Sequence, residues 1–165
     1  MIAVDTSILA FAVNRHAREH ARAAEALDAL ANGDVPWALP WPAVDEFVRL
    51  VTRAHVAPRP LAPSDALGFV EALLPSASLT PLGPGERHAA VLAELLADGA
   101  RGGAVPPGFE VAAVLREHGV RELLSADVGM RRFGFLTVID PVHGAPWSPE
   151  AAPTRRYRRL AAPGA

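Results

Sequence analysis

Short apolar runs alternate with longer amphipathic stretches along the chain. Five runs predict strands, at residues 1–5, 35–39, 78–82, 120–124 and 136–139. Between them, apolar residues recur at spacings of three and four, which predicts helices at 16–31, 42–51, 64–74, 86–97 and 110–118. A further helix is expected directly after the first strand. This alternation predicts one α/β domain with a mainly parallel sheet that helices cover on both faces.

Several residues predict how individual elements begin, end and pack. Asn32-Gly33 should end the first long helix with a left-handed cap. Pro36 restricts the second strand to a sheet edge or places the proline at the strand's start. Pro42 suits the first turn of a helix. The helix at 64–74 is expected to turn four residues inward: Leu67, Val70, Leu73 and Leu74.

Two acidic residues far apart in the sequence each follow a predicted strand. Asp5 comes after the first strand and Asp127 after the fourth. Ligands of parallel α/β sheets bind at the carboxyl ends of strands, so both carboxylates are expected at one rim. Glu46 lies beside the apolar stripe of the 42–51 helix. Each residue also has a simpler interpretation, since aspartates often cap helices and a helical glutamate is often only solvated.

Four segments together resemble a PIN domain, and more narrowly a VapC-type toxin, over roughly residues 1–142. They are Val4-Asp5-Thr6-Ser7, Val44-Asp45-Glu46-Phe47, residues 117–127, and Arg131-Arg132-Phe133 followed by Val138-Ile139-Asp140-Pro141. The resemblance implies a three-layer sandwich around a five-stranded, mainly parallel sheet. It also implies a ribonuclease that a small antitoxin protein blocks, and a homodimer.

The resemblance assigns catalysis and Mg²⁺ or Mn²⁺ binding to Asp5, Glu46 and Asp127. Hard divalent ions prefer carboxylate oxygens. A bound ion lowers the pKa of a water molecule and neutralises charge at an attacked phosphate. Thr6 and Ser7 would orient a carboxylate or hold a water molecule from the second layer of the site, although both also suit plain helix capping.

One acid that the family pattern leads us to expect is absent. Counting forward from the preceding proline places it at Pro107, and counting back from Gly119 places it at Gly108. Glu110 is the nearby carboxylate. Two helical positions rotate a side chain by about 200°, so Glu110 could substitute only if the helix began late and the loop bent it back.

Charge is distributed unevenly along the chain. All 16 basic residues are arginine, residues 1–150 carry a net charge of −6, and residues 151–165 carry +4. An acidic body does not indicate nucleic-acid binding by bulk charge. We expect a PIN-like domain at 1–145 and a flexible tail at 146–165. Four tail arginines are candidate RNA contacts, or could pair with acids of the body: Arg155, Arg156, Arg158 and Arg159.

The sequence is compatible with two functions. The first is a Mg²⁺- or Mn²⁺-dependent endoribonuclease toxin. The second is a PIN-like domain that has lost catalysis and binds RNA or a protein. Another α/β hydrolase is disfavoured, because the chain has neither a Gly-x-Ser-x-Gly elbow nor a Walker loop. The chain has no cysteine and no long apolar run, which suits a cytoplasmic protein without a membrane span.

Overall fold

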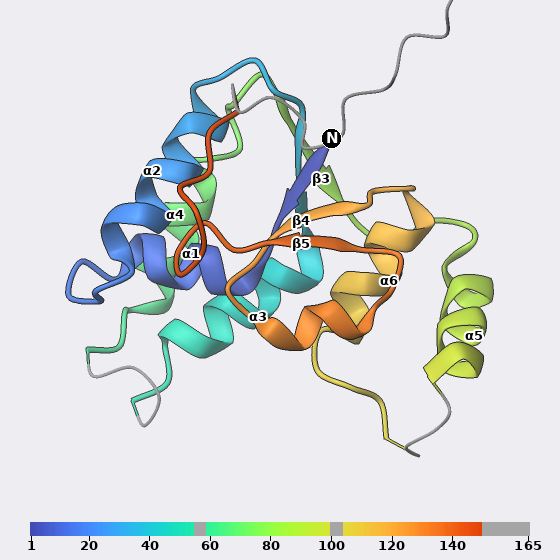
Figure 1. The fold of residues 1–165 in the computed structure, drawn as a ribbon. Helices are drawn as coiled ribbons and strands as arrows, with labels where there is room; N and C mark the ends of the chain where they lie inside the picture. Colours follow the sequence, from blue (N-terminus) through green and yellow to red (C-terminus); the bar gives the residue numbers. More distant parts are fainter. Residues whose placement is uncertain (55–58, 100–103, 150–165) are drawn as a thin grey trace, which may run out of the picture.

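A parallel sheet of five strands forms the centre of the molecule (Figure 1). The computed structural model describes residues 1–54, 59–99 and 104–149. The strands are β1 (Ile2–Val4), β2 (Trp37–Pro40), β3 (Leu79–Leu82), β4 (Glu122–Leu124) and β5 (Thr137–Ile139). Their order across the sheet is β3-β2-β1-β4-β5, and all four neighbouring pairs are parallel. The predicted fold class is confirmed.

Helices cover both faces of this sheet. They are α1 (Thr6–Val13), α2 (His20–Ala31), α3 (Trp41–Val51), α4 (Pro63–Glu71), α5 (His88–Gly99) and α6 (Phe109–Glu117), with a 3₁₀ helix, η1, at Val128–Arg132. In Figure 1, α1, α2 and α4 lie on one side of the strands, and α5 and α6 lie on the other. The three layers of the predicted sandwich are therefore present.

Alternate residues of the central strands face two separate apolar cores. Ile2, Val4 and Leu124 pack into the core with α1, α2 and α4. Ala3 and Leu123 pack into the core with α5 and α6. This alternation follows from the two-residue period of a strand, and the small side chain of Ala3 leaves room for the wholly buried middle of α6.

The strand register brings two distant segments together at the carboxyl edge of the sheet. Val4 of β1 pairs with Leu124 of β4. The next residues, Asp5 and Ser125, are therefore neighbours, and the Asp5 backbone N–H donates to the Leu124 carbonyl at 3.0 Å. Both strands end there, so their following side chains gather at one rim.

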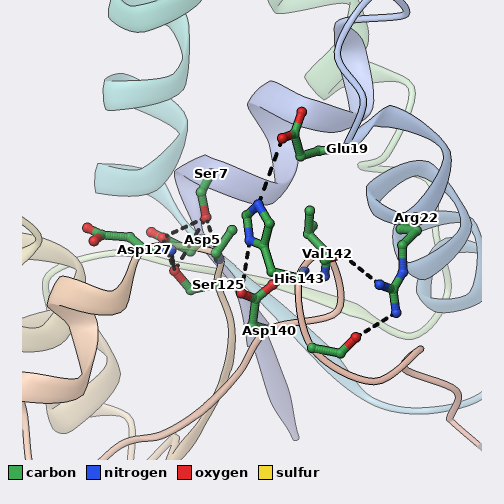
Figure 2. Close-up of polar contacts among 11 residues, drawn as sticks. Asp5, Ser7, Glu19, Arg22, Ser125, Asp127, Asp140, Val142 and His143 are labelled. Atoms are coloured by element: carbon green, nitrogen blue, oxygen red, sulfur yellow. Dashed lines mark hydrogen bonds and ion pairs between the residues drawn. The ribbon is translucent and has the colours of Figure 1, made fainter.

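The chain after β5 is fastened against α2 (Figure 2). Two guanidinium nitrogens of Arg22 donate to the carbonyls of Val142 and Gly144, both at 2.8 Å. The Asp140 carboxylate accepts the backbone N–H groups of Val142 and His143 at 2.9 Å. Arg22 thus holds this segment against α2, and Asp140 fixes the turn that follows β5.

Three local predictions were wrong. Asn32 has a right-handed backbone conformation, with a φ of −105°. Its backbone N–H and its side-chain amide both donate hydrogen bonds to Asp28, which hold it there. Leu67 and Leu74 are 48% and 38% exposed. Val70 and Leu73 are buried as predicted, together with Ala66, and α4 ends at Glu71, before Leu74. In addition, α2 begins at His20 and not at residue 16.

Within the ranges that the structure describes, no helix has both the length and the hydropathy that a membrane span requires.

Two glycines with positive φ provide a test of the packing around the start of α6. Gly108 has a φ of +77°, and a Cβ there would lie 2.4 Å from the Met130 sulfur. Gly119 has a φ of +70° and nothing within 4 Å of such a Cβ. We expect Gly119→Ala to cost about 1–2 kcal/mol of unfolding free energy from backbone strain alone. Gly108→Ala should cost about 1–3 kcal/mol more, because Met130 must move.

Urea unfolding of both variants and the parent measures this difference. Equal losses for the two substitutions would show that Met130 does not fill the space beside Gly108.

Candidate functional site

Asp5 is the buried carboxyl at the centre of the candidate site. It follows β1, precedes α1 and is 4% exposed. Its side chain forms no capping hydrogen bond to α1. Among the described residues, the buried polar side chains are Asp5, Thr6 and Ser125, and all three lie at this rim. Burial of a carboxyl is costly unless it is hydrogen-bonded, so its partners define the site.

Two serine hydroxyls bind one oxygen of Asp5 (Figure 2). Ser125 Oγ donates to Asp5 Oδ2 at 2.6 Å, and Ser7 Oγ reaches the same atom at 3.2 Å. Each serine also accepts a backbone N–H beyond β4, from Asp127 to Ser125 and from Ala126 to Ser7, both at 3.0 Å. The network thus ties the end of β1, the start of α1 and the end of β4 around one carboxyl oxygen.

Glu46 joins this site through Thr6. The Thr6 hydroxyl lies 3.0 Å from Glu46 Oε2 and 3.1 Å from the Ala43 carbonyl. A hydroxyl has one proton, so Thr6 donates to one of these acceptors at a time. Both acceptors belong to α3, and Thr6 therefore fixes α3 against the start of α1 and holds Glu46 beside Asp5.

The electrostatics of Asp5 follow from this position. Burial raises the pKa of the Asp5 carboxyl above its ordinary value, and the nearby Glu46 carboxylate raises it further. The hydrogen bonds from Ser125 and Ser7 lower the pKa, but they do not cancel the rise. A nearby cation would favour the charged form of Asp5 for the same reason that Glu46 disfavours it.

Asp127 is at the same rim but has a different environment. It is exposed, and its Oδ1 accepts the Gly129 N–H at 2.7 Å, which caps η1. The capping interpretation from the sequence therefore describes what Asp127 does here. Its backbone N–H is bound to Ser125, so the residue is still connected to Asp5 through one hydroxyl.

A hollow of about 460 Å³ opens beside Glu46, between α3 and the start of α6. Pro107, Gly108 and Glu110 line it from the α6 side. Helix α6 begins at Phe109, so it does not begin late, yet Glu110 still borders the same hollow as Glu46. Of the two positions for the absent acid, Gly108 is crowded, because a Cβ there would lie 2.4 Å from the Met130 sulfur, whereas Pro107 is exposed.

The chemistry of these donors suits a hard divalent ion. Asp5 and Glu46 offer carboxylate oxygens, which Mg²⁺ and Mn²⁺ prefer, and Mg²⁺ normally keeps several waters. In residues 1–54, 59–99 and 104–149, however, no three histidines or acids lie close enough to hold a metal together. The site thus suits a divalent ion that is bound by two carboxylates and takes its remaining ligands from water or substrate.

Ser125 belongs to the site although its role was not predicted from the sequence. Its hydroxyl lies two residues before Asp127 at the end of a strand, and this placement was the available signal. The tail arginines predicted to contact RNA, at positions 155, 156, 158 and 159, lie outside the described residues.

Solved structures share this arrangement of strands and helices. VapBC2 from Rickettsia felis, bound to a DNA fragment from its promoter, aligns with a TM-score of 0.61 and 16% identity, over 84% of this chain and 98% of that one. VapC20 of Mycobacterium tuberculosis, a toxin that cleaves the sarcin–ricin loop, aligns with a TM-score of 0.59 and 20% identity, over 82% and 97%. The chain therefore has the fold of these two solved structures.

Sequence relatives identify the family more narrowly. Ribonuclease VapC43 of Mycobacterium tuberculosis is 36% identical over 144 residues, which cover 87% of this chain and 97% of the relative. Ribonuclease VapC37 of the same species is 31% identical over 130 residues, with 79% and 90% covered. No family model matches the sequence. The chain belongs to the VapC family.

The raised pKa of Asp5 predicts how stability changes with pH. Below about pH 4, near the unfolded-state pKa, protonated Asp5 contributes its full share of stability. That share is lost as the pH rises through the higher folded-state pKa. We therefore expect the unfolding free energy of the wild type, relative to Asp5→Asn, to fall as pH increases from about 4.

Urea unfolding at a series of pH values, in a chelating buffer, measures this difference. Asp34→Asn removes an exposed carboxyl and is the matched control, with little change expected. A relative stability that instead rises with pH would mean that the folded protein favours ionised Asp5.

Proposed function

We propose that the chain is a metal-dependent endoribonuclease toxin that hydrolyses RNA phosphodiester bonds. The observation that carries the proposal is the buried Asp5 carboxyl, held by two hydroxyls beside Glu46 at the carboxyl rim of the sheet. Carboxyls whose pKa is raised by burial and by a neighbouring acid cluster at functional sites. The ribonuclease names of the VapC relatives support the same reaction.

Each residue has a role in this proposal. Asp5 and Glu46 would hold Mg²⁺ or Mn²⁺, with Asp127 as a third acid nearby. When bound, the ion supplies an activated water molecule and neutralises charge on the phosphate. Ser125 and Ser7 bind Oδ2 of Asp5, and Thr6 orients Glu46.

The proposed partners are an RNA substrate, a cognate antitoxin and a second copy of the chain. Similar solved structures include the VapBC2 assembly and FitAcB from Neisseria gonorrhoeae, which supports a protein partner for this chain. We further propose a cytoplasmic location, a PIN-like domain at 1–145 and an arginine-rich tail at 146–165.

A Mn²⁺ titration by calorimetry tests the metal part of the proposal. The wild type should bind Mn²⁺ saturably, and Asp5→Asn and Glu46→Gln should each weaken binding at least tenfold, because each removes one of two carboxylate ligands. Asp45→Asn, which changes an exposed neighbour of Glu46, should bind like the wild type. An RNA cleavage assay on the same proteins should show the same ranking.

Absence of Mn²⁺ binding in the wild type, with circular dichroism showing a folded protein, would contradict the nuclease proposal.

A second candidate function is a PIN-like module that binds RNA or protein without cleaving. Pro107-Gly108 supports it, because neither residue supplies the carboxylate that the family pattern places there. Pro107 is exposed and lines the hollow beside Glu46, so Pro107→Asp should add a ligand and tighten Mn²⁺ binding several-fold. Gly108→Asp is the matched control. It should not tighten Mn²⁺ binding, because Met130 crowds a side chain at that position. Cleavage that appears only in Pro107→Asp would favour the module as the natural function.

A further inference from the structure

The exposed face of α3 continues past Glu46 with two arginines. Arg49 lies three residues after Glu46, and Arg53 lies seven residues after it. At 3.6 residues per turn, these spacings place all three side chains on one face of the helical path. Arg53 follows the end of α3, but its N–H still donates to the Leu50 carbonyl at 3.4 Å, so the chain is still turning there.

Both arginines line the hollow that Glu46 and Glu110 also border. The rise of a helix places Arg49 about 4.5 Å and Arg53 about 10 Å beyond Glu46 along the axis. Along α3, the hollow therefore has the carboxylates of Asp45 and Glu46, followed about one to two turns further by the two cationic groups. This charge order matches an RNA strand with one phosphate at the carboxylates and a neighbouring phosphate at the arginines.

Arg49 is held in a position to receive an anion. Its Nε donates to the Asp45 carbonyl at 3.1 Å, which fixes the guanidinium on the surface of α3. Across the described parts of the chain, its two terminal nitrogens have no hydrogen-bond or ion-pair partner, and neither does the Arg53 guanidinium. An arginine with its terminal donors free can bind a phosphate through two parallel hydrogen bonds.

We propose that Arg49 and Arg53 form a phosphate-binding subsite that holds the RNA backbone next to the Asp5–Glu46 pair. The proposal rests on the proposed function for the identity of the ligand. It also explains how a body with a net charge of −6 can bind RNA, since attraction is local to this hollow and does not need a basic surface.

Fluorescence anisotropy with a short single-stranded RNA of mixed sequence tests the subsite. Asp5→Asn is used as the background without metal, because it removes one negative charge and prevents cleavage. Affinity is measured over a series of salt concentrations. Arg49→Gln and Arg53→Gln should each weaken binding several-fold and reduce the slope of log affinity against log salt by about 0.7, the value for one phosphate contact on a single strand.

Two controls separate charge from structure. Arg49→Lys keeps the charge and should retain the salt slope. Its loss of affinity should be smaller than that of Arg49→Gln, and should arise because an ammonium group cannot make two parallel hydrogen bonds to a phosphate. Arg121→Gln removes an exposed arginine just before β4, at the opposite edge of the sheet, and should bind like the background. Thermal melts confirm that every variant folds.

Each outcome decides the proposal. Unchanged affinity and slope in both glutamine variants, or no RNA binding by the background, would overturn it. If the glutamine variants keep RNA binding but lose binding to an acidic protein partner, the proposal is also overturned. The arginines would then belong to the surface that binds this partner. If the predicted slope changes appear but the wild type never cleaves RNA, the subsite stands and the nuclease proposal fails. If the wild type cleaves RNA but the slopes do not change, the subsite alone fails.

Discussion

The buried Asp5 carboxyl is the constraint on which the rest of the site depends. A carboxyl removed from water must be hydrogen-bonded, and Asp5 recruits the hydroxyls of Ser7 and Ser125 for this purpose. Those serines in turn accept N–H groups from the segment after β4. No buried side-chain nitrogen or oxygen in the described ranges lacks a partner, so the rim is a complete network built outward from one carboxyl.

The parallel topology makes this network possible. Asp5 and Ser125 are 120 residues apart, but they follow adjacent strands in register, so no loop has to bring them together. Thr6, the first residue of α1, then binds α3 through Ala43 and Glu46. The elements that meet the sheet at its carboxyl edge are therefore fixed by short polar contacts, while the two apolar cores hold the helices on either face.

The sequence was sufficient for the parts of this structure that depend on periodicity. Short apolar runs that alternate with amphipathic helical segments predicted the parallel sheet. The positions of Asp5 and Asp127 directly after strands predicted that both lie at the carboxyl edge of this sheet. Leu67 was misplaced because a helix with apolar residues on several faces does not specify which face is buried, and Leu74 was misplaced because α4 ends at Glu71. Ser125 was missed because its importance comes from strand register, which a single sequence does not reveal.

The start of α6 shows how packing can decide where chemistry is possible. Gly108 has a positive φ just before α6, and the buried Met130 side chain crowds the position that a Cβ there would take. Met130 belongs to η1, the helix that Asp127 caps, so the capping of η1 and the closure of this space are parts of one arrangement. A carboxylate can enter the hollow from Pro107 or Glu110 without disturbing that packing, but not from Gly108. The acidic content of this site is thus limited by an apolar contact between η1 and α6.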